Sequence, residues 1–479
     1  MSDVRSQVPA YGDAASASAP QRNATFTLKM LLLAGMGAVF FVTYGFSNWL
    51  AGQHAHVPSF AFAWEQYIPF WPWTIVPYWS IDLLYAASFF LWTQRDELLG
   101  HAKRLLTTQS ISFVCFVLWP LRFGFERPPV SGVSGALFTL LAGFDKPFNQ
   151  APSLHIGLLV VLWVLYATRL RGFWRGVVHV WFAMIGLSVF TTYQHHMIDV
   201  PTGAAVGCFA LFLFPMPGVR MSTVDAATRA QARRLAWRYA MGAAVGLAAA
   251  CFTIPVAPAW SLLLGWIALA LLCVAIVYWR ADPALFQKDE HGNMPWPALM
   301  LFAPTIFGMF VNSRLWTLRH PAPTPVHDDV FVGRIPTSRA LRRAGITAVV
   351  DLTAEMPRWG GSGSTLAYVC VPQLDLVLPT LAQIRQTVAA IDTLRASGHR
   401  VLVCCALGYS RSALSTCCWL ADHLQLDDAQ EAVALLRAAR PQIVLSTQGV
   451  ALIQHYIAQR AVVAAAVVVA APTASNRHA

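Results

Sequence analysis

Long apolar runs fill much of this 479-residue chain and constrain its fold more than any other feature. Stretches of about 17 to 25 apolar residues can cross a bilayer as helices. Hydrophobic residues make up 56% of the chain and charged residues 12%, whereas roughly a quarter of a typical soluble domain is charged. We predict about eight transmembrane helices, near 30–50, 72–93, 105–122, 153–169, 176–193, 197–216, 238–255 and 259–279.

The basic residues between these runs predict an orientation. If the N-terminus is cytoplasmic, the inner segments carry fourteen Arg and Lys residues and the outer loops carry three. An excess of this kind marks the cytoplasmic side. We therefore expect a multi-pass protein of the cell inner (cytoplasmic) membrane, with its C-terminal part in the cytoplasm. The apolar stretch 295–312 has basic flanks on both sides and three prolines, so we interpret it as interfacial or re-entrant, with a ninth span as the alternative.

Charge and cysteine content argue against two other classes of protein. The net charge of +11 comes from short clusters beside the apolar runs, so we expect no nucleic-acid partner. The nine cysteines lie in apolar or strand-like segments and do not form a disulfide framework. Residues 1–27 are polar and rich in Ala and Ser, and we expect a disordered leader there instead of a signal peptide.

The C-terminal third has a different pattern, in which short β-type runs alternate with amphipathic helical runs. Such alternation predicts an α/β domain with a central, mainly parallel sheet. We place this domain at 326–460, after a linker at 217–325 with two further spans and the interfacial segment, and before an apolar or disordered tail at 461–479. The expected strands are FVGRI, AVVDLT, LAYVCVP and VLVCCA, and the expected helices are SRALRRAG, PTLAQIRQTVAAIDTLRASG, RSALSTCCWLADHLQL and DAQEAVALLRAAR.

A candidate phosphate loop joins the last of these strands to the helix after it. A loop in this setting points backbone N–H groups at one spot, and the helix N-terminus adds positive potential. A cysteine at its start is held as the nucleophilic thiolate, and an arginine six positions later can clamp phosphate oxygens. Gly408 lets the loop curl, and Ser412 can hydrogen-bond the sulfur. The segment is Cys405, Ala406, Leu407, Gly408, Tyr409, Ser410, Arg411 and Ser412.

Residues 329–460 resemble the dual-specificity phosphatases of the protein tyrosine phosphatase superfamily. VFVGRIP, SRALRRAGITAVVDLTAE and VCCALGYSRSA carry the resemblance. It implies catalysis without metal or cofactor, and a general acid on a loop before the cysteine, where this chain has Asp375. The alternative role for Asp375 is to cap the helix near Pro379, and Asp351 is expected to be structural. Cys404 stands where that family usually has a histidine.

A second group of ionisable residues interrupts the spans, on the outer face of the predicted topology. Ionisable groups at membrane depth are costly and are therefore functional candidates. His195 and Asp199 are four apart, so on a helix they share a face and the carboxylate can orient the imidazole. Two histidines can divide phosphoryl transfer between a nucleophile and an acid. The alternative is that these side chains only reach the headgroups. The clusters are Arg122–Pro128, Pro152–His155 and Thr192–Asp199.

Residues 28–216 resemble the type 2 phosphatidic acid phosphatase superfamily, through PSLH and HHMIDVPTG. The resemblance implies His195 as nucleophile, Asp199 as its partner, His155 as acid, and Ser153 and Arg127 as phosphate contacts.

Two cations usual in that family are replaced here, by Pro120 and Val189. The remaining pattern is more similar to the sphingolipid synthase branch, which exchanges phospho-headgroups between lipids. The membrane half could therefore be a phosphatase, a headgroup transferase or a binding module.

Together these features predict a two-domain, bacterial-type membrane phosphatase. We expect it to hydrolyse phosphomonoesters through a cysteinyl-phosphate intermediate, on a phosphorylated phospholipid or lipid headgroup. The alternatives are a membrane-tethered protein tyrosine or serine phosphatase, a phospho-headgroup transferase in the membrane half, and a receptor or scaffold that only binds phosphate.

Overall fold

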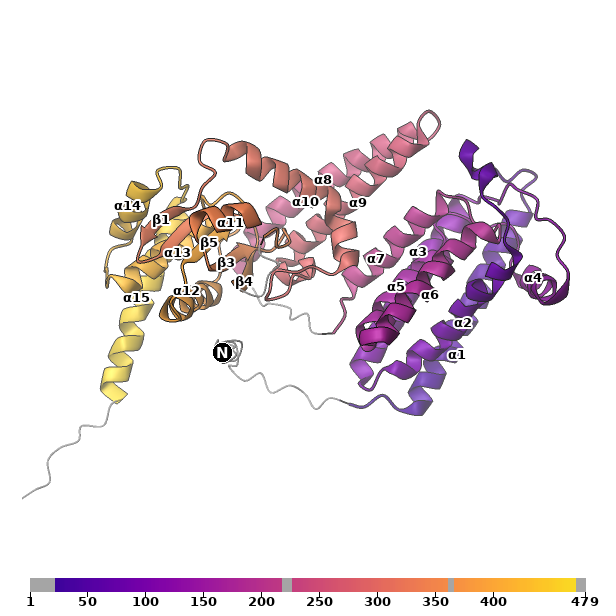
Figure 1. The fold of residues 1–479 in the computed structure, drawn as a ribbon, viewed down its shortest axis with the longest axis horizontal. Coiled ribbons are helices and arrows are strands. Elements are labelled where there is room, and N and C mark those ends of the chain that lie inside the picture. Colours follow the sequence, from indigo (N-terminus) through magenta and orange to yellow (C-terminus); the bar gives the residue numbers. More distant parts are fainter. Residues whose placement is uncertain (1–21, 218–225, 361–365, 471–479) are drawn as a thin grey trace, which may run out of the picture. The chain divides into compact units, whose positions relative to one another are not determined.

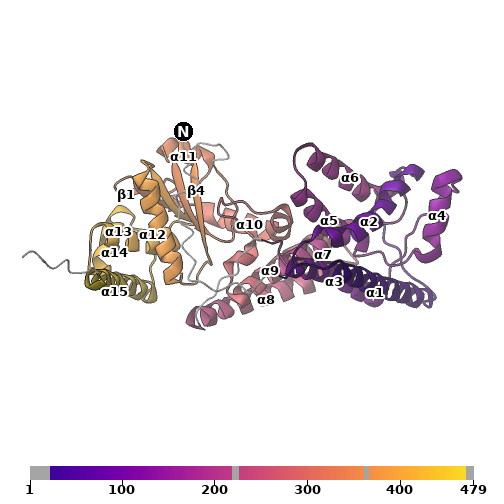
Figure 2. The same cartoon turned by 90° about the horizontal axis from the view of Figure 1, so that it is seen from below.

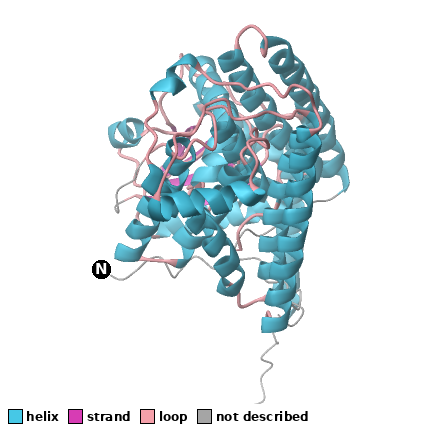
Figure 3. Cartoon of the chain, turned by 90° about the vertical axis from the view of Figure 1, so that its right-hand side faces the viewer, coloured by secondary structure: helices cyan, strands magenta, loops and turns pink. Residues whose placement is uncertain are grey.

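The chain forms two compact units that meet in sequence between Val219 and Arg220 (Figure 1). The computed structural model describes residues 22–217, 226–360 and 366–470. The first unit is helical, and the second combines long helices with an α/β domain. Helices make up most of the chain, and the strands are confined to one small region (Figure 3). The predicted leader at 1–27 lies largely outside the described residues, which begin at Arg22.

The first unit is a bundle in which the helix α5 packs against α7, α6 and α3. Glycines allow the close approach of α5 and α7. A Cβ atom added at Gly203 would lie 2.4 Å from the carbonyl oxygen of Ser153, so only glycine fits there. The helices are α1 (Phe26–Gly52), α2 (Ile75–Ser88), α3 (Arg95–Leu118), α4 (Gly132–Phe144), α5 (Leu154–Arg169), α6 (Gly172–Thr191) and α7 (Asp199–Leu213).

Six helices among the described residues are long and apolar enough to cross a membrane, and they suggest membrane association. Five of them match predicted spans, and the sixth is Trp296–Trp316, which covers the stretch interpreted as interfacial. The predicted spans at 153–169 and 197–216 correspond to the shorter helices α5 and α7. The span at 105–122 falls on α3, which begins earlier, at Arg95. The count of eight therefore stays a prediction.

The second unit opens with three helices, α8 (Ala226–Thr253), α9 (Pro258–Arg280) and α10 (Trp296–Trp316). Helices α8 and α9 pack against each other along their length (Figure 1). The short 3-10 helix η5 (Pro283–Phe286) and an extended loop join α9 to α10.

Lys288 in this loop anchors the helices to the α/β domain. Its ammonium group lies 2.5 Å from the Asp351 carboxylate, and both side chains are fully buried. Burial alone would lower the pKa of Lys288, but the Asp351 carboxylate raises it above its usual value. Removing one partner of a buried pair typically costs about 3 to 5 kcal/mol. Asp351 is thus structural, and the linker is part of the α/β fold.

The α/β domain contains a five-stranded sheet with the order β1-β2-β5-β3-β4. The pairs β2–β5, β5–β3 and β3–β4 are parallel, while β1 pairs with β2 antiparallel. The sheet is therefore mixed, and the added edge strand β1 was not predicted. The four predicted strands are all present. The strands are β1 (Thr324–His327), β2 (Val330–Arg334), β3 (Ala348–Thr353), β4 (Ala367–Gln373) and β5 (Val401–Cys405).

Helices cover both faces of this sheet. On one face α12 and α13 pack on the strands, and α14 and α15 pack on α13 (Figure 2). On the other face, a smaller core forms around Leu341 of α11 and Phe331. The predicted tail at 461–479 is helical as far as Ala470, because α15 continues past the expected domain end. The helices are α11 (Ser338–Ala344), α12 (Leu381–Ala396), α13 (Arg411–His423), α14 (Ala429–Ala439) and α15 (Thr447–Ala470).

Candidate active site

Cys405 is the last residue of β5, and α13 begins six residues later at Arg411. The loop between them curls around the cysteine sulfur. The backbone N–H of Gly408 donates to Cys405 Sγ over 3.2 Å, and Ser412 Oγ lies 3.4 Å from the same sulfur. Gly408 has a φ of +75°, and a Cβ atom there would lie 2.3 Å from the carbonyl carbon of Gly333. The curl predicted for Gly408 and the contact predicted for Ser412 are both present in this geometry.

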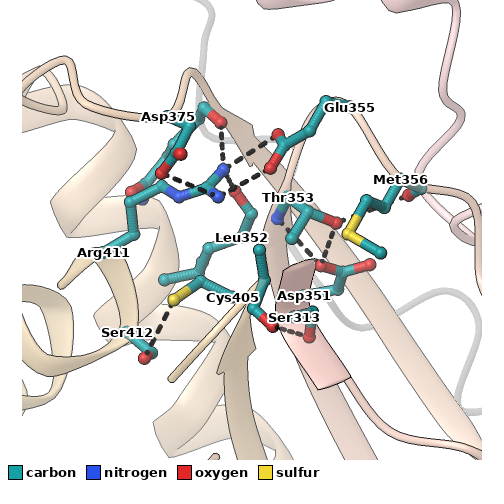
Figure 4. A network of polar contacts seen from close by, with 12 residues as sticks. Ser313, Asp351, Leu352, Thr353, Glu355, Met356, Asp375, Cys405, Arg411 and Ser412 are labelled. Atoms are coloured by element: carbon teal, nitrogen blue, oxygen red, sulfur yellow. Dashed lines mark hydrogen bonds and ion pairs between the residues drawn. The ribbon is translucent and has the colours of Figure 1, made fainter. Parts of the chain in front are cut away.

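The Arg411 guanidinium is buried near Cys405 and is held by two carboxylates (Figure 4). Its Nη1 and Nη2 atoms donate to both oxygens of Glu355, over 2.9 and 2.6 Å. Asp375 Oδ1 lies 3.1 Å from Nη2. Burial alone would lower the pKa of Arg411, but the Glu355 and Asp375 carboxylates raise it well above its usual value. The group therefore keeps its charge inside the fold.

One donor of Arg411 remains available. Its Nε–H is buried and has no hydrogen-bond partner within the described part of the chain. A buried donor of this kind is costly unless a ligand completes it. No role was predicted for Glu355, although it is the last residue of the segment SRALRRAGITAVVDLTAE, which carries the family resemblance. It pairs with both Nη atoms along one edge of the guanidinium, and Nε lies outside that pair.

Asp375 lies on the loop between β4 and α12, and its side chain is 47% exposed. It does not cap the following helix. Thr380 caps α12 instead, in a capping box with Gln383. The carboxylate is thus turned toward Arg411 and accessible to solvent, as a proton donor for a bound phosphate ester needs to be.

Cys404 points away from the candidate nucleophile, because successive side chains of a strand alternate between the two faces of a sheet. Cys405 belongs to the core under α12 and α13, and Cys404 belongs to the core on the opposite face. Burial, assisted by Asp351, raises the pKa of the Cys404 thiol well above its usual value. Cys404 is therefore a protonated core residue.

Side chains outside the phosphate loop hold the loop backbone. Arg440 Nε donates to the Gly408 carbonyl oxygen over 3.0 Å. From α10, the Ser313 hydroxyl donates to the Ala406 carbonyl oxygen over 2.5 Å. The Tyr409 hydroxyl donates in turn to a backbone oxygen of α10, at Trp316, over 3.2 Å. An apolar helix thus contacts the phosphate loop directly, which the sequence did not predict.

The first unit brings Ser153, His195 and Asp199 into one hydrogen-bonded chain. Ser153 Oγ lies 3.0 Å from His195 Nε2, and Asp199 Oδ2 lies 3.2 Å from His195 Nδ1. The expectation that His195 shares a helix with Asp199 is wrong. α7 starts at Asp199, and His195 lies in the loop before it. The contact forms because this loop turns back over the first turn of α7.

The adjacent His196 has a structural environment. Its Nε2 accepts the Gly124 N–H over 3.0 Å, so Nδ1 carries the proton and donates to Glu65 over 2.8 Å. Glu65 also accepts the Met197 N–H. The 3-10 helix η2 (Ala63–Tyr67) and two loops that are far apart in sequence meet at this histidine. Glu65 was not predicted.

Arg127 and His155 lie close to the hydrogen-bonded Ser153, His195 and Asp199 side chains but make other contacts. The Arg127 guanidinium donates to the carbonyl oxygens of Thr192 and Tyr193. It also lies 4.6 Å from the Phe138 ring. His155 stacks on Tyr78 with ring centroids 4.2 Å apart. Its Nε2 has no partner among the residues that the structure describes.

One group of side chains in the described ranges has ligand atoms close enough to hold a metal ion, namely His327, Asp328 and His423. All three side chains are solvent-accessible, and Arg395 already pairs with the Asp328 carboxylate at 3.0 Å. Asp328 precedes β2, whereas Cys405 ends β5, its parallel neighbour. The group therefore lies at the opposite end of the sheet from the cysteine loop.

Comparison with known proteins connects the cysteine loop to a family. Residues 330–457 match the family model described as the dual specificity phosphatase catalytic domain. Human DUSP28 is 25% identical, with a TM-score of 0.27, and the match covers 29% of this chain and 98% of that chain. A mouse putative dual specificity phosphatase is 26% identical, with a TM-score of 0.28 and coverages of 30% and 91%. PTPMT1 is 19% identical, with a TM-score of 0.27 and coverages of 30% and 98%.

Proposed function

Because residues 330–457 form a dual-specificity phosphatase catalytic domain, we propose that the chain is an integral membrane phosphatase that hydrolyses phosphomonoesters of phospholipids or their headgroups. The Cys405 thiolate attacks phosphorus and forms an S–P bond while the ester P–O bond breaks. Asp375 gives its proton to the leaving oxygen. Water then attacks the cysteinyl phosphate, Asp375 takes a proton from it, and the thiolate leaves with the Ser412 hydroxyl beside it.

The observation that carries this proposal is the convergence of three groups on one point. Cys405 Sγ accepts a loop N–H, and Asp375 lies 3.1 Å from the Arg411 guanidinium. The buried Nε–H of Arg411 has no partner among the residues that the structure describes. Preorganised donors aimed at the equatorial oxygens of phosphorus stabilise charge that develops during transfer. A loop built only to bind phosphate does not require the acid beside the arginine.

The exposed apolar surface of helix α10 favours a lipid substrate over a protein substrate. It exposes large apolar side chains, with Phe307 at 69%, Leu315 at 60% and Trp316 at 71%. Exposed apolar surface of this extent is typical of a membrane contact. Because Ser313 of the same helix bonds the phosphate loop, a lipid held against α10 would present its phosphate close to Cys405.

Contacts at both ends of α10 support an interfacial position for this helix. Just before α10, the Gly292 carbonyl oxygen accepts the Arg358 N–H over 2.8 Å. Near its end, Ser313 bonds the phosphate loop of the same domain. A spanning helix would place its ends on opposite faces of a layer about 30 Å thick. The same folded domain contacts both ends of α10, so both ends lie on one side of the membrane if the helix lies along its surface.

The test compares Cys405→Ser with Cys404→Ser in the detergent-solubilised full chain. The substrates are phosphatidylglycerophosphate, phosphatidic acid and a phosphotyrosine peptide. We expect Cys405→Ser to lower phosphate release by at least about 10⁴-fold, because it removes the nucleophile. Cys404→Ser changes a neighbouring thiol on the other face of the sheet and should retain turnover.

The outcomes separate the alternatives. Phosphate release that survives Cys405→Ser at the original rate would overturn the cysteine mechanism. Faster turnover of the peptide than of either lipid would replace the lipid phosphatase by a membrane-tethered protein phosphatase. No turnover of any phosphoester by the wild-type chain, with phosphate bound, would favour the scaffold.

The Ser153–His195–Asp199 chain supports a second candidate function, a lipid phosphatase or phospho-headgroup transferase in the first unit. Asp199 fixes the Nδ1–H tautomer of His195, which leaves Nε2 to attack phosphorus. Ser153 lies beside that nitrogen and can contact a phosphate oxygen. His155, whose Nε2 has no partner within the described ranges, would be the acid.

A further inference from the structure

The loop that carries Asp375, residues 374–378 (the acid loop), contains a strained backbone position. Leu376 has a φ of +57°, in the left-handed region that non-glycine residues rarely adopt. Its side chain is 66% exposed, so burial of the leucine does not hold it there. Such a conformation costs about 1 to 3 kcal/mol and persists only where neighbouring contacts enforce it.

Two side chains from outside the α/β domain supply those contacts. The Tyr278 hydroxyl donates to the carbonyl oxygen of Asp375 over 3.0 Å. The Gln231 amide donates to the carbonyl oxygen of Leu376, also over 3.0 Å. Two successive carbonyl groups of the acid loop are therefore bound by α9 and α8. One bond fixes the peptide plane before Leu376 and the other fixes the plane after it, so together they hold the strained conformation of Leu376 next to Asp375.

Helices α8 and α9 are a packed pair in which both members are apolar and long enough to span a bilayer. The ends that reach the acid loop carry aromatic and basic side chains. The Tyr239 and Tyr278 rings lie 5.3 Å apart, and Trp237 meets Trp279 edge to face at 5.9 Å. The Arg233 guanidinium lies 5.0 Å from the Trp279 ring. Aromatic belts with basic residues occur at membrane–water interfaces.

We infer that Tyr278 and Gln231 are positioning residues that hold Asp375 in place for proton donation, so that the helix pair α8–α9 is part of the catalytic unit. The inference rests on the proposed function, in which Asp375 protonates the leaving oxygen. Without the two bonds, Leu376 relaxes to negative φ and the Asp375 carboxylate moves away from Arg411. Misplacement of a catalytic group by about 1 Å can cost about 10²-fold in rate.

Substrates with different leaving groups give the test. A nitrophenolate leaves without being protonated, whereas an alkoxide needs the acid. The detergent-solubilised full chain is assayed in the same micelles with two kinds of substrate. One is 4-nitrophenyl phosphate, and the other is phosphatidylglycerophosphate or a phosphoserine peptide, whichever the wild type hydrolyses faster. For Tyr278→Phe we expect turnover of the alkyl ester to fall about ten- to hundredfold, while turnover of 4-nitrophenyl phosphate stays near wild type.

Two further variants make the result specific. Gln231→Met removes the second bond from a different helix, and it should shift the ratio of the two rates in the same direction. Tyr166→Phe is the matched control, because the Tyr166 hydroxyl also donates to a backbone carbonyl oxygen, that of Leu84 in the first unit. It should leave the ratio unchanged.

Equal losses on both substrates, or an unchanged ratio in both Tyr278→Phe and Gln231→Met, would overturn the positioning role. Failure of the proposed function is detected separately. If Asp375→Asn leaves the ratio of the two rates unchanged, Asp375 is not the acid. If Cys405→Ser keeps its turnover, the mechanism itself fails. A shifted ratio in Asp375→Asn with none in Tyr278→Phe or Gln231→Met would retain the enzyme and reject only the inference.

Discussion

The second unit contains the cysteine site, and the first contains the hydrogen-bonded Ser153, His195 and Asp199 with the adjacent His196 (the histidine network). The two differ in the hydrogen bonds that their arginines, Arg411 and Arg127, already make. In both, a buried carboxylate fixes a key side chain, Glu355 for Arg411 and Asp199 for His195. The Nε–H of Arg411 has no partner among the described residues. Arg127 donates instead to two backbone carbonyl oxygens of its own unit.

This difference teaches what separates a site prepared for phosphate from one that is only polar. A dianion needs donors that are fixed before it arrives and are not already satisfied by the protein. In the cysteine site Glu355 fixes the Arg411 guanidinium, and the Nε–H has no partner in the described part of the chain. In the histidine network Asp199 orients His195, and Arg127 is occupied by backbone carbonyl oxygens. The sequence has Pro120 and Val189 where the superfamily it resembles usually has cations.

The substitution Arg411→Lys should have the largest effect in this comparison. An ammonium group cannot take both oxygens of Glu355 and also give a directed donor to phosphate. We expect kcat/KM for 4-nitrophenyl phosphate to fall by about 10²- to 10³-fold, the usual loss for one oxyanion donor. Arg385→Lys on the exposed side of α12 is the control and should behave as wild type. Full activity in Arg411→Lys would mean that other groups bind the phosphate.

The substitution His195→Ala tests whether the first unit is more than an anchor. It is best made in the Cys405→Ser background, where turnover of lipid by the second unit is absent. If the network transfers phosphoryl groups, residual release or exchange of lipid headgroups should fall by about 10²-fold, which is typical for loss of an acid–base or nucleophilic histidine. Radiolabelled phosphatidic acid and phosphatidylglycerophosphate in mixed micelles provide the assay.

Its control is His54→Ala, which removes an exposed histidine of the same unit. Equal residual rates in His195→Ala and His54→Ala would reduce the network to a structural element. The second unit would then contain the active site, and the first unit would be a scaffold.

The cysteine loop could be predicted because all of its parts lie within eight consecutive residues, between a strand and a helix. The residues that hold it could not. Glu355, Arg440 and Ser313 come from separate elements, and only the fold brings them to the loop. Asp375 was located through a family resemblance, whereas the bonds that fix its backbone come from helices outside the matched residues.

The helices show a second limit of sequence analysis. Apolar windows located most of them but missed the start of α3, whose first turn contains Asp96 and Glu97, because acidic residues stabilise a helix N-terminus yet lower hydropathy. The i, i+4 spacing of His195 and Asp199 suggested one helix. Tyr193, with a φ of +54°, ends the preceding helical turn and keeps His195 in a loop. The backbone conformation of Tyr193 therefore determines that His195 lies outside a helix, and the spacing of the side chains does not reveal it.

The smallest effect is expected from Glu65→Gln, which weakens the hydrogen bonds that hold His196 in the histidine network. Both Glu65 oxygens accept, Oε1 from the Phe62 N–H and Oε2 from the His196 Nδ1–H and the Met197 N–H. An amide places an NH₂ group against one of these donors, and His196 cannot reverse its tautomer because its Nε2 already accepts the Gly124 N–H. Leaving a buried donor unpaired costs about 1 to 3 kcal/mol, so the thermal midpoint of the detergent-solubilised chain should fall. Glu126→Gln, on an exposed position of a neighbouring loop, should not change it. An unaltered midpoint in Glu65→Gln would mean that the bond from His196 to Glu65 does not stabilise the fold. His196 would then lack a carboxylate that fixes it, in contrast to Arg411, which Glu355 holds.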